Sequence, residues 1–234
     1  MIRKPLFLLL LALPTLSLAA APAPYQAQYE VSRNGSKLGT ATVVFNALPD
    51  GHYELRTDTI GSEGMAAIAG VTLNERSLLR WTGNVPETLS YSYRQKLAWK
   101  TKERSIQVDA GAGRITSTDK GQARTLKYTP GVLDRNAITV ALIQDLAAHK
   151  TGDLIYPVAD SDSVDAQRYR QAAVETMSTA LGPQRAIRVE RIRDSGNGRV
   201  TTLWFGVDKK YVPLQILQTE ANGETIEMRV TAIR

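Results

Sequence analysis

Apolar and polar residues alternate along much of this chain, which is the pattern of a strand with one face in a core and the other in water. Residues 25–32 read YQAQYEVS, with apolar side chains at every second position. The pair Asn34-Gly35 follows, and it suits the positive φ angles of a two-residue hairpin turn. The alternation resumes over 41–47 and 53–57, on either side of a Pro-Asp-Gly turn. The first sixty residues therefore predict three antiparallel strands.

The C-terminal third repeats this pattern. Strands are expected over residues 184–193, 200–207, 214–219 and 225–232, the last of them after a second Asn-Gly turn. Pro213 has no backbone N–H to donate to a ladder, so it should begin its strand or lie on an edge.

One segment, 134–149, has helical rather than strand spacing. Its apolar residues recur three and four positions apart from Ile138 onward. Asp134 is a suitable N-cap, and Gly152 is a suitable C-cap. An amphipathic helix with one apolar stripe buries that stripe against a sheet. A second departure from alternation, residues 61–70 (GSEGMAAIAG), is small, apolar and bounded by glycine, which indicates a short helix or a flexible flap.

Together these patterns predict a mainly β protein. We expect a strongly curved antiparallel sheet of about ten or more strands, or an incomplete β-barrel, because a sheet that large curls or closes. One packed α-helix, at about 134–149, should lie on or inside it. No internal repeat or Pro-, Gly- or Ser-rich linker follows residue 24, so we expect 20–234 to be a single β-rich domain.

The N-terminus reads MIRKPLFLLLLALPTLSLAA, with a positive start, an apolar run and small residues at a cleavage site. The apolar run is shorter than the ~20 residues that span a bilayer. We therefore expect a signal peptide, 1–19, cleaved near Ala19, with a periplasmic mature protein that has no membrane span. The chain contains no cysteine, so it has neither disulfides nor the cysteine that anchors a lipoprotein.

The residue types argue against most catalytic chemistry. With no cysteine and two histidines, a zinc site is not expected. No Gly-x-Ser-x-Gly elbow and no glycine-rich phosphate loop occur. We predict no enzyme, no catalytic residues, no metal and no cofactor. The formal net charge of +6 is scattered, which disfavours nucleic acid and is compatible with an anionic surface or an envelope protein as partner.

Longer motifs cover almost the whole chain after the predicted signal peptide. They include YQAQYEVSRNGSKLGTATVVF, TPGVLDRNAITVALIQDL and TLWFGVDKKYVPLQILQTEANGETIEMRV. These stretches resemble the exported proteins grouped as the "domain of unknown function 3108" family. The Leu-Asp-Arg that begins the predicted helix and the LWF…YVPLQI hairpin are the most specific parts. This resemblance implies no known activity, so it assigns no catalytic residue.

The C-terminal hairpins also resemble, more weakly, the last strands of the periplasmic lipoprotein-carrier fold. That fold is an incomplete β-barrel with a helical lid over an apolar cavity. The likeness implies a periplasmic soluble binding protein of unknown specificity, with a lipid or acyl chain or another apolar small molecule inside the curved sheet. The residues expected to line such a cavity are Phe45, Met65, Ile68, Ile138, Leu142, Trp204 and Met228.

The alternative is a structural or partner-binding module of the cell envelope with a filled core. Its function would lie on an exposed edge or on the basic strand near 94–104. The same apolar residues would then be ordinary core, as would Trp81 and Trp99. An internal cavity of several hundred Å³ is what would distinguish the carrier from this module.

Overall fold

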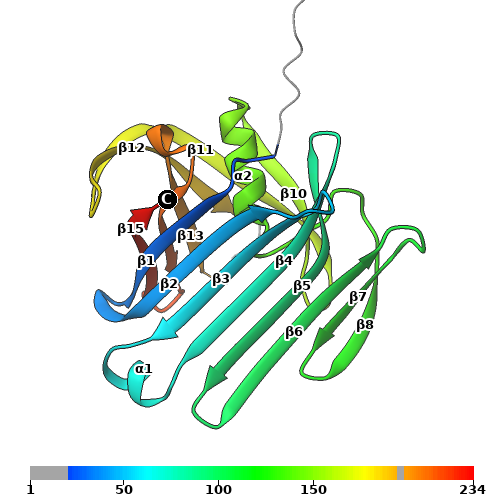
Figure 1. Cartoon of the computed structure of the whole chain (residues 1–234), viewed down its shortest axis with the longest axis horizontal. Helices are drawn as coiled ribbons and strands as arrows, with labels where there is room; N and C mark the ends of the chain where they lie inside the picture. The colour runs from blue at the N-terminus through cyan, green and yellow to red at the C-terminus, as the bar shows by residue number, and fades with distance from the viewer. Residues whose placement is uncertain (1–20, 194–197) are drawn as a thin grey trace, which may run out of the picture.

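One sheet makes up most of the computed structural model, which describes residues 21–193 and 198–234 (Figure 1). Fifteen strands are formed by these residues, in the order β8 to β1 followed by β15 to β9. All neighbours are antiparallel except β9 and β10, which are parallel. The expected signal peptide, 1–19, lies outside the described residues.

The strands are β1 Tyr25–Arg33, β2 Ser36–Ala47, β3 Tyr53–Gly61, β4 Thr72–Thr82, β5 Val85–Leu97, β6 Lys100–Asp109, β7 Arg114–Asp119, β8 Gln122–Lys127, β9 Leu133–Asp134, β10 Asp153–Ala159, β11 Val164–Thr179, β12 Gly182–Ile192, β13 Val200–Gly206, β14 Pro213–Thr219 and β15 Thr225–Ile233. The helices are α1 Gly64–Ile68, α2 Ile138–Ala147 and the 3₁₀ turn η1 Val207–Lys209.

The architecture predicted from alternation is confirmed: the protein is mainly β, with one large curved sheet that does not close. The hairpin at Asn34-Gly35 has φ angles of 50° and 75°, as a two-residue turn of that type requires. Strand β14 begins at Pro213, where the missing N–H does no harm to the ladder. Residues 61–70 contain the short helix α1, one of the two forms expected for them.

The sheet curls until its β9 edge meets the first residues of β5, which are not paired with β6. The backbone N–H of Thr88 in β5 donates to the carbonyl oxygen of Val132, just before β9, at 2.9 Å. Figure 1 shows α2 enclosed between the β1–β5 half of the sheet and the half that contains β10–β13. The other edge, β8, does not take part in this closure.

Helix α2 is buried on nearly all sides, which differs from the single apolar stripe expected. Eight of its ten residues are buried, and two of those are polar. Gln144 accepts a hydrogen bond from Trp81 Nε1 at 2.7 Å, and Asp145 accepts one from Tyr156 OH at 2.8 Å. A helix surrounded by a curled sheet meets apolar side chains in several directions, and α2 is therefore the centre of the core.

The helix is also shorter than the expected 134–149. Its first part is diverted because Leu133–Asp134 pair with β10 as β9. At the other end His149, not Gly152, takes the left-handed position after the helix, with φ of 53°. Its N–H donates to the carbonyl of Leu146 at 3.0 Å, which ends the helix. The expected C-cap at Gly152 was wrong.

Candidate functional site

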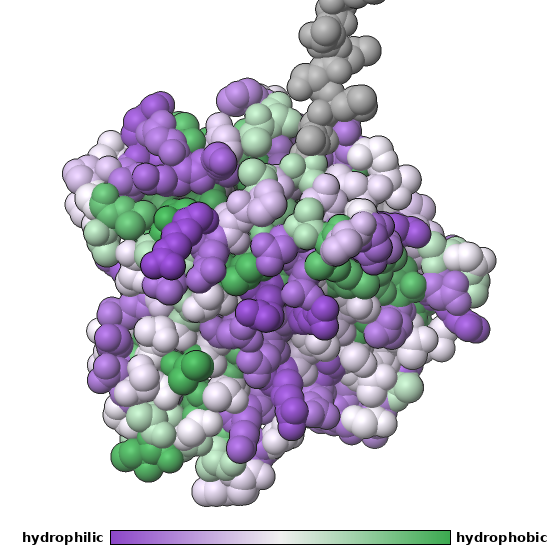
Figure 2. All heavy atoms as spheres, viewed as in Figure 1, coloured by the Kyte–Doolittle hydropathy of each residue, from purple (hydrophilic) through white to green (hydrophobic). Residues whose placement is uncertain are grey.

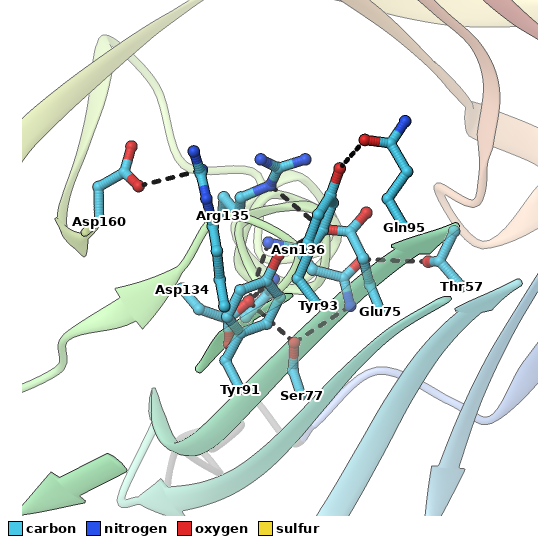
Figure 3. A network of polar contacts seen from close by, with 12 residues as sticks. Thr57, Glu75, Ser77, Tyr91, Tyr93, Gln95, Asp134, Arg135, Asn136 and Asp160 are labelled. Atoms are coloured by element: carbon cyan, nitrogen blue, oxygen red, sulfur yellow. Dashed lines mark hydrogen bonds and ion pairs between the residues drawn. The ribbon is translucent and has the colours of Figure 1, made fainter. Parts of the chain in front are cut away.

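The Asp134 carboxylate lies at the centre of a polar network where α2 begins (Figure 3). It is fully buried. It accepts hydrogen bonds from Ser77 Oγ and Thr88 Oγ1, both at 2.8 Å, and from the N–H groups of Asn136 and Ala137 at 2.9 and 3.0 Å. Burial raises the pKa of this carboxyl to about 6, against the opposing effect of the hydrogen bonds. Asp134 thus fixes the turn that precedes α2 and joins it to β4 and β5.

Asn136 extends this network to β3. Its side-chain oxygen accepts a hydrogen bond from Thr57 Oγ1 at 3.0 Å, and its Nδ2 donates to Ser77 Oγ at 3.1 Å. Three neighbouring strands are therefore connected to one short segment. We call the eight residues Thr57, Glu75, Ser77, Thr88, Tyr91, Asp134, Arg135 and Asn136 the seam network.

The outer part of the seam network is the ion pair of Arg135 with Glu75, in which Arg135 also lies over the Tyr93 ring. Arg135, whose side chain is 45% exposed, lies 3.1 Å from a Glu75 oxygen through its Nε. Tyr91 OH donates to the same oxygen at 2.5 Å. The Arg135 guanidinium also lies 5.1 Å from the centre of the Tyr93 ring, within the range of a cation–π contact. Burial, followed by the nearby Glu75 carboxylate, raises the pKa of Tyr91, so its phenol stays protonated and donates.

A second buried carboxylate, Glu87, holds the chain just before β9. Glu87 accepts hydrogen bonds from Tyr128 OH at 2.7 Å, from the N–H of Gly131 at 2.9 Å and from Arg80. This side chain is 4% exposed. Asp134 and Glu87 together fix residues 128–136 onto β4 and β5.

The hydrogen bonds and ion pair of the seam network serve to stabilise the fold. Its buried groups are saturated with partners from the chain itself. The space beside it, where Ala159 and Asp160 approach Tyr91, amounts to ≈10 Å³, about the volume one water needs and far too little for a substrate. Surfaces outside the seam are therefore the places where another molecule can bind.

The outer face of the sheet carries an open hollow of ≈630 Å³ over β3–β7. Exposed arginines and carboxylates alternate across it, and Figure 2 shows hydrophilic residues across the middle of this face. Most of these charges already have partners: Arg56 lies 2.9 Å from Asp58 and Arg94 lies 3.3 Å from Glu103. Exposed pairs of this kind contribute little to stability, so the hollow is a hydrated surface with balanced charge.

Strand β8 is a free edge of the sheet in the described part of the chain. Tyr128, directly after it, donates its N–H to the carbonyl of Gly113 at 3.1 Å, which sets the register with β7. Main-chain groups alternate in direction along an antiparallel strand. The groups that face away from β7 are those of Ala123, Thr125 and Lys127.

The residues expected to line a cavity separate into two sets. Ile138 and Leu142 of α2 pack in one core cluster with Phe45, and Trp204 and Met228 pack against that cluster, half-buried. Met65 and Ile68 instead lie on α1 and are 75% and 80% exposed. Whether any of the seven contacts a ligand stays a prediction.

Trp99, expected in core or cavity, is 97% exposed. It lies in the two-residue turn between β5 and β6, where no other element covers it. Trp81, the second tryptophan expected inside, packs against the core as predicted.

The seam network was not predicted, and the expected N-cap at Asp134 was wrong: Asp134 belongs to β9, and Ala137 is the N-cap of α2. A signal for the seam network exists in β4, where Glu75 and Ser77 occupy the inward positions between Leu73 and Leu79. Polar residues in the inward register of a strand need buried partners. Those partners come from residues 134–136, some sixty positions away, and only the curling of the sheet brings them there.

Over residues 21–193 and 198–234, no three or more histidine or carboxylate side chains gather in a group that could hold a metal ion. In the same residues no helix is long and apolar enough to cross a membrane.

These features define a class of protein, the incomplete β-barrel, in which an open curved sheet encloses one helix. The crystal structure of a β-barrel-like protein of domain of unknown function DUF1849 from Brucella abortus has this fold, with a TM-score of 0.57 and 11% sequence identity over 92% of this chain and 98% of that one. The chain itself belongs to the family described as "Protein of unknown function (DUF3108)", whose model matches residues 28–231. The family resemblance seen in the sequence is confirmed.

MucB in its complex with MucA from Pseudomonas aeruginosa is less similar, with a TM-score of 0.36 and 12% identity. The match covers 90% of this chain and 51% of the MucB chain, so this chain spans about half the length of MucB. No curated protein matches the sequence.

Proposed function

We propose that this protein is an exported partner-binding module, which takes an extended segment of another protein on its free edge, β8. The observation that carries this proposal is an edge strand, β8, which pairs with β7 on one side only, in a sheet whose other edge meets β5. The proposed compartment is the periplasm, reached with the signal peptide 1–19.

The occupied centre of the sheet argues against the carrier hypothesis, and the hollow of ≈320 Å³ beside Met177, Leu214 and Val230 is partly open rather than enclosed. A lipid chain needs a cavity of several hundred Å³. The centre of the curved sheet is occupied by α2, and the large side chains around it, such as Phe45, Leu55 and Phe205, have no exposed surface. A ligand would have to displace a helix that the seam network ties to three strands.

The edge has the chemistry for strand addition. An added strand pairs its main chain with the outward N–H and carbonyl groups of Ala123, Thr125 and Lys127. The six residues of β8 are mostly exposed, so no side chain needs to leave a core. Covering by a partner satisfies main-chain groups that otherwise depend on water.

The charge of the edge selects an acidic partner. Lys120, Arg124 and Lys127 are basic, and no acidic residue occurs between Asp119 and Asp134. Such charges also protect a free edge from pairing with other copies of the same chain. An extended segment with aspartate or glutamate residues is attracted to these positive charges, whereas the basic edge of a second copy of this chain is repelled by them.

The test uses Thr125→Pro in the full-length exported protein, with a photo-crosslinking amino acid at position 127. Proline removes only the outward-facing N–H of residue 125 and leaves the ladder with β7 intact, so the fold should persist. Thr125→Val is the matched control, since it changes the side chain and keeps the N–H. We expect crosslinked protein adducts in cells that make the parent or Thr125→Val, and their loss with Thr125→Pro.

Circular dichroism and thermal melting of the three purified proteins show whether they are equally folded. Adducts that persist in folded Thr125→Pro, or that never form in the parent, would refute the proposed strand addition.

A further inference from the structure

Helix α1 and the turn between β5 and β6 lie at the end of the sheet opposite α2 (Figure 1), and both carry exposed large apolar side chains. Trp99 is 97% exposed, Ile68 80% and Met65 75%. Ile60, next to the last residue of β3, and Leu97, the last residue of β5, are also exposed. We call these five residues the apolar tip. Single exposed apolar residues are ordinary, but a group of large ones marks a surface that meets something other than water.

The apolar tip is one connected piece of structure. Helix α1 lies in the connection between β3 and β4, and the N–H of Gly61 donates to the carbonyl of Val71 at 2.8 Å, which closes that connection. The N–H of Ala98, in the turn that carries Trp99, donates to the carbonyl of Ala69 at 2.6 Å. The backbone therefore holds Met65 and Ile68 on the same end of the molecule as Trp99.

Positive charge surrounds the tip. Residues 96–102 read KLAWKTK, with three lysines and no acidic residue. Among the described residues no carboxylate forms an ion pair with Lys96 or Lys100. The acidic residue that precedes α1, Glu63, lies 3.6 Å from Lys37, which also lies 3.5 Å from Glu30. The tip thus presents apolar side chains with free lysine ammonium groups on either side of the tryptophan.

We propose that the apolar tip docks the protein reversibly on a bilayer that contains anionic lipids. Tryptophan prefers the boundary between head groups and acyl chains, where its ring has both polar and apolar surroundings. Lysines beside it attract negatively charged head groups. Met65, Ile68 and Trp99 enter the boundary, while Lys96 and Lys100 remain at the head groups. The tip is a turn and a short helix at the end of the molecule, so it reaches a membrane before the rest of the sheet does.

The charges favour a lipid surface over a second copy of this chain. A dimer through the tip would bring Lys96 and Lys100 of each copy close to those of the other, and none of the five tip residues is acidic. The docking proposal does not depend on the β8 edge, which lies on other strands.

The experiment is co-sedimentation of the mature chain with vesicles of phosphatidylethanolamine and phosphatidylglycerol, compared with vesicles of phosphatidylcholine. We expect binding to the anionic vesicles only, weakened about tenfold or more by Trp99→Ser. The double variant Lys96→Gln/Lys100→Gln should weaken binding by a similar factor and reduce its dependence on salt. Ile155→Ser, which changes an exposed apolar residue of β10, is the matched control and should bind like the parent.

Three results would overturn the proposal. The first is no binding of the parent to anionic vesicles, and the second is equal binding by Trp99→Ser and the parent. The third is a parent dimer in analytical ultracentrifugation that Trp99→Ser converts to a monomer, which would assign the tip to self-association. Brominated lipid quenches the fluorescence of a tryptophan that enters the bilayer. The Trp99 signal, measured as the difference between the parent and Trp99→Phe, should therefore be quenched if the tip inserts and should be unchanged if the protein is held by charge alone.

Discussion

Asp134→Ala is expected to lower the free energy of unfolding at neutral pH by about 3–5 kcal/mol. Removing the carboxylate leaves two hydroxyl groups and two backbone N–H groups without their acceptor in a fully buried site. The loss includes the attachment of α2 to β4 and β5, so it should appear as lower stability of the whole fold. Urea titration followed by circular dichroism measures it.

The pH dependence of Asp134→Asn separates charge from hydrogen bonding. Asparagine keeps an acceptor for the N–H groups of residues 136 and 137 and cannot ionise. The folded pKa of Asp134, about 6, lies above its ordinary 3.8. Its stabilising effect is therefore complete below pH ~4 and is lost as the pH rises through about 6, by up to ~3 kcal/mol. The parent should exceed Asp134→Asn in stability by more at pH 4 than at pH 7.

Asp162→Ala provides the comparison for an exposed aspartate. It should change the free energy of unfolding by less than about 0.5 kcal/mol at either pH. The structural role proposed for Asp134 would be contradicted if Asp134→Ala lowered the free energy of unfolding as little as Asp162→Ala does. It would also be contradicted if the difference in unfolding free energy between the parent and Asp134→Asn did not vary with pH.

Leu142→Ala is expected to cost about 2–5 kcal/mol in the free energy of unfolding. Leu142 is at the centre of α2 and has no exposed surface. Its truncation leaves a cavity in a packed core, which relaxes only partly. If the interior were instead a ligand space, the same change would enlarge that space at little cost. Leu142→Asp should prevent folding altogether, because it buries a charge without a partner.

Ile68→Ala is the matched control, since it also truncates an apolar residue expected to line a cavity. Ile68 is 80% exposed on α1, so we expect a change within about 0.5 kcal/mol. Equal costs for Leu142→Ala and Ile68→Ala would contradict the assignment of α2 as the centre of the core. Thermal melting of both variants gives the comparison.

The strands could be predicted from the sequence because alternation and turn residues are local signals. The Asn34-Gly35 turn and the start of β14 at Pro213 are examples. The bounds of α2 could not, because the ladder between β9 and β10 competes for Leu133–Asp134. A helix on an open sheet keeps one face in water, whereas a helix enclosed by a curled sheet is buried on most sides. The burial of α2 therefore depends on how far the sheet curls, which the helix sequence does not show.

The candidate site and surfaces likewise divide into features with a local sequence signal and features that depend on the tertiary fold. Glu75 and Ser77 carried a readable signal, since both occupy inward positions of β4, but their partners are set by the tertiary fold. The position of Trp99 was open to prediction from the turn between two strongly patterned strands. The free edge required the strand order, because alternation alone does not tell which strand of a meander has no neighbour.

Hydrogen exchange of the α2 amides, from Val140 to Leu146, tests most directly whether the interior of the sheet is filled by the chain's own helix. We predict that these amides exchange only when the whole protein unfolds, with an opening free energy equal to that from urea denaturation. Opening of α2 at a free energy several kcal/mol below the global value would show instead a movable helix over a space that a ligand can enter.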